Sequence, residues 1–189
     1  SKEGFNSLRS TFANSYLPSR LLLYNGTEEQ VNLKSTTWET RYTRSFSFAK
    51  YFYLMADAGY DMARKNEIVS YNDTTASVKY QEDKVYLEPG LQFRKSDFSV
   101  RANLDMMWLS RRFDTDKDNR FVFEPNVSVE WSILSFWNWR TDYRHTFSPS
   151  GFYEVNPLRI YTSYNMASSG TGANNHSAGD EVSTGLQYQ

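Results

Sequence analysis

The sequence contains no cysteine, which excludes disulfide bonds, thiolate metal sites and thiol catalysis. This absence also suits a protein that crosses an oxidising compartment such as the bacterial periplasm. Histidine is scarce as well, with only two residues in the chain. We expect no cofactor.

Charge of one sign and long apolar runs are also missing. The formal net charge is -1, so the chain has no basic field that would attract nucleic acid. No run approaches the roughly 18 apolar residues of a spanning helix, and no signal peptide is recognisable. We expect a mature protein or an internal segment of one, and any crossing of a membrane must be made by strands.

Aromatic residues are abundant, at 17% of the chain, although mean hydropathy is only -0.69 and 23% of residues are charged. A transmembrane β-barrel has this mixture, because one face of every strand meets lipid and the other faces a polar lumen. The composition therefore favours an all-β membrane protein over a protein with an ordinary soluble core.

Alternation of polarity is the main pattern of the sequence. From Phe121 to Trp131, apolar residues at one set of alternate positions face a mainly polar set at the others. A period of two is typical of a strand with one apolar face and one wet face. Seven segments share the pattern: 38–48, 52–62, 85–93, 98–108, 121–131, 137–147 and 182–189.

The connections between these segments alternate in length. Short turns are expected at Ala49–Lys50, Lys95–Asp97 and Ser132–Ser135, and long polar loops at 64–83, 112–120 and 148–180. Outer-membrane barrels combine short periplasmic turns with long extracellular loops, so 148–180 is predicted to be a long extracellular loop. Trp108 follows Phe98 by ten positions, which at a tilt near 40° spans about 25 Å, the height of the apolar band.

Two further strands are expected near the N-terminus, at Leu8–Tyr16 and Leu21–Tyr24, with a turn at Leu17–Arg20. The total is then nine, whereas single-chain bacterial barrels usually have even counts. We expect an antiparallel transmembrane β-barrel with eight to ten visible strands, or part of a larger one. Pairing of Leu8–Tyr16 with Val182–Gln189 would indicate a small closed barrel. A soluble lipocalin-like barrel with its aromatic faces inside is the alternative fold.

Charged residues on the wet faces are the candidate functional residues. Cross-strand pairs are predicted between Glu124 and Arg144, Asn126 and Asp142, and Arg101 and Glu130. Such charges could select solutes in a lumen, or fill a narrow barrel with ion pairs, which is the interpretation we favour. The lumen-facing candidates are Glu88, Arg101, Asp105, Glu124, Glu130, Arg140, Asp142 and Arg144.

Metal binding and catalysis have weak candidates. Asp114, Asp116 and Asp118 have the first spacings of a calcium loop, but Asn119 replaces the turn glycine and Pro125 occupies the twelfth position. We therefore expect no metal site. His145, Ser148 and Glu154 invite comparison with outer-membrane lipid deacylases, but their spacing differs and the stretch is expected to be a loop. We expect that the protein is not an enzyme.

The C-terminal part resembles known outer-membrane proteins. The run EPNVSVEWSILSFWNWRTDYRHTFSPSGFYEVNPLRIYTSYN, within Phe121–Gln189, resembles the late-barrel hairpin and long loop of TonB-dependent receptor-type proteins of Bacteroidetes. Ser183–Gln189 resembles the terminal strand that such proteins present to their assembly machinery, although the usual final aromatic residue is absent. No plug domain or TonB box is visible. The resemblance implies energised or ligand-gated import of a nutrient, and an incomplete chain.

We thus expect residues 1–189 to form a single barrel domain or a barrel fragment in a bacterial outer membrane. The expected function is transport, through a channel or a segment of a receptor-type importer. A structural or adhesive barrel with a filled lumen is the alternative, and a membrane-embedded lipid hydrolase is the third. Expected partners are membrane lipid, lipopolysaccharide, the barrel-assembly machinery and other barrel segments, but not nucleic acid.

Overall fold

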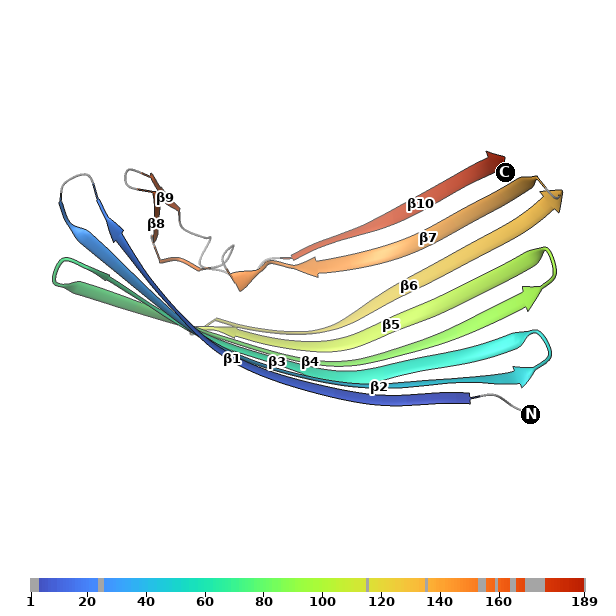
Figure 1. Cartoon of the computed structure of the whole chain (residues 1–189), viewed down its shortest axis with the longest axis horizontal. Coiled ribbons are helices and arrows are strands. Elements are labelled where there is room, and N and C mark those ends of the chain that lie inside the picture. The colour runs from blue at the N-terminus through green and yellow to red at the C-terminus, as the bar shows by residue number, and fades with distance from the viewer. Residues whose placement is uncertain are drawn as a thin grey trace.

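The computed structural model describes residues 4–23, 26–114, 116–134, 136–152, 156–158, 160–163, 166–168 and 176–188. Eight long strands form one curved antiparallel sheet in the order β1-β2-β3-β4-β5-β6-β7-β10 (Figure 1). The strands of this sheet are β1 (Gly4–Leu22), β2 (Glu28–Ala49), β3 (Phe52–Tyr71), β4 (Thr74–Lys95), β5 (Phe98–Phe113), β6 (Asp116–Leu134), β7 (Trp137–Pro149) and β10 (His176–Tyr188). The expected all-β, antiparallel class is confirmed.

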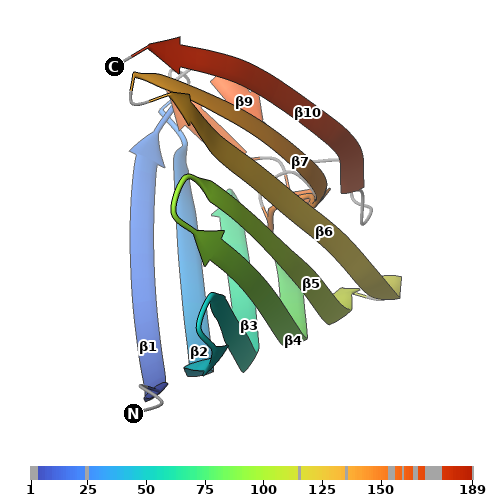
Figure 2. The ribbon, with the colours of Figure 1, turned by 90° about the vertical axis from the view of Figure 1, so that its right-hand side faces the viewer.

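The sheet is a simple meander with two free margins. Each strand pairs with its neighbour in sequence, except that β10 follows β7 after an intervening segment. Within the described residues β1 pairs only with β2, and β10 only with β7, so Leu8–Tyr16 is not bonded to the last strand. Figure 2 shows the two margins at opposite sides of the sheet. The sheet is therefore open, and the predicted closure is not present.

The predicted count of nine strands is wrong, because the N-terminal turn does not exist. Leu17–Arg20 was expected to reverse the chain, but β1 continues through it and keeps its register with β2 from Gly4 to Leu22. Pro18 lacks a backbone N–H and is tolerated because β1 is an edge strand. The first reversal lies between β1 and β2, where Gly26 has a φ of 80°.

Two of the three predicted long loops are also strands. Residues 64–83 form the outer halves of β3 and β4, which are joined by a two-residue turn at Asn72 and Asp73. Residues 112–120 are the end of β5 and the start of β6. Asn72 and Asp114 adopt positive φ, a conformation that asparagine and aspartate accept more readily than most residues. The polar sequence here forms regular paired strands, and not irregular loops.

The described residues of the connection from β7 to β10 lie on the inner side of the curved sheet. They include the two-stranded hairpin of β8 (Ile160–Ser163) and β9 (Met166–Ser168), within the segment that was expected to be a long loop. Figure 1 shows this hairpin on the concave side of the sheet, near the ends of β1 and β2. Phe152 anchors the start of the connection in a small cluster of buried apolar residues.

The two faces of the sheet differ in polarity. The convex face carries exposed apolar side chains, and the concave face carries the charged ones. One row across the convex face shows this: Leu87 on β4 pairs with Met106 on β5, and Met106 pairs with Phe123 on β6. The lipocalin-like alternative requires the aromatic face on the inside of the curve, and here it is on the outside. The exposed apolar residues of this face include Val85, Leu87, Leu91, Trp108, Phe121, Phe123, Val127, Val182 and Leu186.

Two rows of aromatic side chains border the apolar part of the convex face. One row follows the short turns, where the Phe52 and Phe93 ring centroids are 4.9 Å apart and those of Phe93 and Phe98 are 6.2 Å apart. The other row contains Trp38, which meets Tyr60 edge-on at 5.9 Å. We call the surface between these rows the apolar belt. Trp108 belongs to the second row and is 50% exposed.

Beyond the second row the polarity of the two faces is exchanged. The convex side becomes polar and carries Arg64, whose guanidinium donates to both carboxylate oxygens of Asp83 at 2.8 Å. The concave side gains a buried apolar cluster of Leu33, Val78, Tyr80, Phe113 and Phe152, beside which Glu67 and Arg111 are also buried. A strand of 22 residues spans roughly 70 Å, so β2 and β4 extend far beyond the belt.

Candidate functional site

The concave face between the two aromatic rows holds all eight predicted lumen-facing residues. Adjacent strands place Asp105 beside Glu124, and Glu130 beside Arg140. Glu88 extends the first of these rows, since it lies in register with Asp57 on β3. Arg101, Asp142 and Arg144 are on the same face, because they sit at even spacings from these residues along β5 and β7.

The predicted cross-strand partners are wrong by two residues. Arg144 faces Asn126 and not Glu124, Asp142 faces Ser128 and not Asn126, and Arg101 also faces Ser128. The reversal between β6 and β7 lies between Leu134 and Trp137, later than the predicted turn, and a bulge follows Ser132. A shift of two residues changes the partners without changing the face. The Glu124 carboxylate instead accepts a hydrogen bond from the backbone N–H of Phe147.

Cations on the concave face near β2 to β4 are neutralised. Arg41 lies 2.5 Å from the carboxylate of Asp57 and 3.8 Å from that of Glu88. The ammonium of Lys84 is 2.8 Å from Asp61. These cross-strand pairs fill the middle of the face with opposite charges, as expected for a stabilising network between neighbouring strands.

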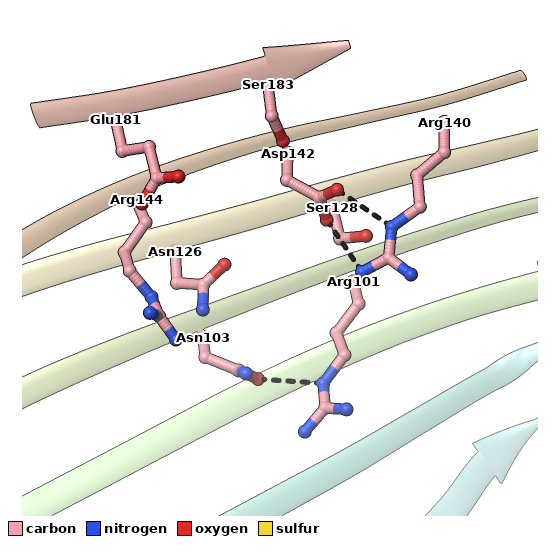
Figure 3. Close-up of a pocket in the computed structure, with 9 residues that line it drawn as sticks. All are labelled: Arg101, Asn103, Asn126, Ser128, Arg140, Asp142, Arg144, Glu181 and Ser183. Carbon is pink, nitrogen blue, oxygen red and sulfur yellow. Dashed lines mark hydrogen bonds and ion pairs between the residues drawn. The ribbon is translucent and has the colours of Figure 1, made fainter. Parts of the chain in front are cut away.

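A polar hollow of about 400 Å³ lies on the same face over β5, β6, β7 and β10 (Figure 3). Three of its residues are arginines, and two are acids. The lumen-facing candidates from the sequence include Arg101, Arg140, Asp142 and Arg144, and Asn126 was predicted as a partner of Asp142. The remaining four residues have amide, hydroxyl and carboxylate groups that carry no recognisable motif. The hollow is lined by Arg101, Asn103, Asn126, Ser128, Arg140, Asp142, Arg144, Glu181 and Ser183.

The arginines of the hollow differ in their partners. Arg140 is held by Asp142, with Nε 2.7 Å from one carboxylate oxygen and a second bond of 3.0 Å to the other. Arg101 makes only a long hydrogen bond of 3.4 Å to the Asn103 amide oxygen. Within the described residues, neither Arg101 nor Arg144 has a carboxylate within ion-pair distance, although Arg144 and Glu181 are register partners. The hollow therefore has free cationic groups.

Above the hollow, the described residues that follow β7, 150–152 and 156–158, pack on the extended strands. We call them the docked segment. Arg111 is 1% exposed and lies 3.2 Å from the Glu82 carboxylate, and it donates to the backbone oxygen of Ser150. The Asn156 amide donates to the buried carboxylate of Glu67. Burial raises the pKa of Glu67, and the bond from Asn156 and the charge of Lys65 oppose the shift. No local pattern predicts this contact, since its partners are far apart in the chain.

The catalytic and calcium candidates are not brought together. The imidazole of His145 is 2.9 Å from the Asp180 carboxylate on the convex face, whereas Ser148 lies an odd number of positions away on β7 and projects from the other face. Glu154 lies outside the described residues. Asp118 is paired with Arg120 at 2.8 Å. The described residues contain no group of three His, Cys, Asp or Glu side chains arranged to hold a metal ion.

Comparison with known proteins gives no relative. No protein-family model, no curated protein and no solved structure matches the chain. Helices offer no route across a membrane either: in the part of the chain that the structure describes, none is long and apolar enough to span one. The function must therefore be inferred from the sheet and its two faces.

Proposed function

We propose that the chain forms part of the wall of a wide transmembrane β-barrel in a bacterial outer membrane, and that its concave face lines a pathway for polar solutes. The observation that carries this proposal is the exchange of polarity at the second aromatic row. Below the row the convex face is apolar, and above it the same face is polar. A strand that leaves a bilayer and enters water requires this change.

The geometry of the belt agrees with the dimensions of a bilayer. Phe98 and Trp108 lie on β5, near the two borders of the belt, and are separated by ten positions. With the tilt usual for barrel strands, this separation corresponds to about 25 Å. The short turns then lie on the periplasmic side, and the extended ends of β2 to β6 project above the outer surface together with the docked segment.

The open margins favour a barrel larger than this sheet. An exposed edge in lipid leaves N–H and C=O groups unsatisfied, at several kcal/mol each. Eight strands that stay open need further strands at β1 and β10, from the same polypeptide or from other subunits. A wide barrel has a lumen that needs a plug or a gate, which agrees with the receptor-type importer suggested by the resemblance of the C-terminal part.

A structural or adhesive barrel is the second candidate, and a specific observation favours it. The cross-strand ion pairs of Arg41 and Lys84 fill part of the concave face in the way that a closed, narrow barrel requires. The free arginines of the hollow favour transport instead. Single-channel conductance of the complete barrel in a planar bilayer, with any plug removed, distinguishes the two, since a lumen filled by its own side chains carries no current.

Thiol labelling tests the membrane assignment, because the chain has no cysteine of its own. Cysteine replaces Leu104 on the convex face and Asn103 on the concave face, and each variant is labelled in intact outer membranes with a water-soluble maleimide. Lys79→Cys is the matched control, since it lies on the convex face beyond the second aromatic row. We expect Asn103→Cys and Lys79→Cys to react and Leu104→Cys to be protected. Equal labelling of Leu104→Cys and Lys79→Cys would contradict the proposal.

A further inference from the structure

The hollow over β5 to β10 differs from the rest of the concave face in its balance of charge. Elsewhere between the aromatic rows, Arg41 and Lys84 each lie against a carboxylate. In the hollow, three guanidinium groups face two carboxylates, and one of these, Asp142, is bound to Arg140. Arg101 and Arg144 thus have no carboxylate at ion-pair distance among the described residues, although three further acids, Asp105, Glu124 and Glu130, lie beside the hollow on the same face.

The neutral groups of the hollow are also available to a ligand. Asn103 and Asn126 are register partners on β5 and β6, and both side chains are half-buried. The Asn126 amide makes no hydrogen bond to another described residue, and Figure 3 shows it beside Asn103 and the end of Arg144. An amide both donates and accepts, so Asn103 and Asn126 suit the hydroxyls of a sugar.

We propose that the hollow binds a small polyhydroxylated anion, with its carboxylate or phosphate group held by Arg101 and Arg144 and its hydroxyls by the amides of Asn103 and Asn126. This inference rests on the proposed function, because it names the solute class of the same pathway. The planar guanidinium fork matches carboxylate and phosphate oxygens, and charge-assisted bonds are the strong ones. A volume of about 400 Å³ accommodates a solute the size of a monosaccharide.

Binding of three matched sugars to the complete barrel that contains this chain, purified and inserted in lipid nanodiscs, tests this proposal. Galacturonate carries a carboxylate, galactose 6-phosphate a phosphate and galactose no charge, and isothermal titration gives each Kd. We expect at least one anionic sugar to bind about tenfold more tightly than galactose, and added salt to weaken it. The anionic sugar that binds more tightly shows whether the hollow prefers a carboxylate or a phosphate group. Equal affinity for all three sugars would overturn the proposal.

Substitutions locate the binding to the hollow. Arg101→Gln and Arg144→Gln should each bring the affinity for the anionic sugar close to that for galactose, whereas Arg101→Lys should retain part of the preference. Arg9→Gln is the control, because Arg9 lies on the concave face at β1, opposite Arg41 and outside the hollow. An equal loss of affinity in Arg9→Gln would show that the preference comes from the overall charge of the concave face, and it would refute the site. Labelling of Leu104→Cys tests membrane insertion separately, so the two proposals can fail independently.

Discussion

Replacement of Gly59 by alanine tests the packing of the concave face. Gly59 pairs with Tyr86 across β3 and β4, and the Tyr86 side chain lies over the glycine. A Cβ at this position would be 2.4 Å from the Tyr86 ring and 2.5 Å from the backbone oxygen of Thr40. The ring could swing away, but the oxygen belongs to the adjacent strand and can move only if β2 and β3 separate.

The expected cost follows from this contact. Forcing an additional methyl group into a packed site costs typically about 1–3 kcal/mol, and here the backbone contact favours the upper half of that range. Gly185→Ala is the matched control, since Gly185 is also in a strand, β10, and no atom lies within 4 Å of the added Cβ. Urea unfolding of both variants in the same lipid gives the free energies. If Gly59→Ala lowers the free energy of unfolding no more than Gly185→Ala does, the close packing around Gly59 is refuted.

Two further predictions concern the docked segment. Phe152→Ala should loosen the docked segment, because removal of a buried ring typically costs about 3–5 kcal/mol. Amide hydrogen exchange should then become faster at Asn156 and stay unchanged at Val100. For Glu67 the folded pKa is raised, so docking is strongest below the unfolded pKa and weakens as pH rises through the folded pKa. Glu67→Gln should therefore abolish this pH dependence of the protection factor at Asn156, which is the exchange rate corrected for the intrinsic effect of pH on amide exchange. A dependence that persists in Glu67→Gln would assign it to another group.

The alternation of side chains on each strand was predictable from the sequence, and the partners of those strands were not. In β6 the period of two assigns Val127 and Ser128 to opposite faces, as in the structure. The β6–β7 register depends on a turn after Leu134 and a bulge after Ser132, whereas the sequence predicts a simple turn at Ser132–Ser135 and no bulge. A correct face with incorrect partners is the outcome of an even register error.

Strand extensions and long-range contacts were the parts that sequence reasoning missed. Residues 64–83 are polar on the convex side, and in a single sequence such a polar stretch predicts a loop as readily as a strand. The Glu67–Asn156 contact joins residues 89 positions apart, and no local pattern predicts it. Only part of the hollow was predictable. Its arginines are recognisable in the sequence by their charge, whereas Asn103 and Asn126 look like ordinary strand residues.

Arginine at two adjacent positions of β6 tests the central claim most directly. Val127 is in the apolar belt and Ser128 is the next residue, on the concave face between Arg101 and Asp142. In a bilayer, Val127→Arg should cost on the order of 2–4 kcal/mol in the free energy of unfolding. Ser128→Arg should cost clearly less, because its side chain faces the polar hollow. A greater loss for Ser128→Arg than for Val127→Arg would invert the faces and contradict the membrane assignment.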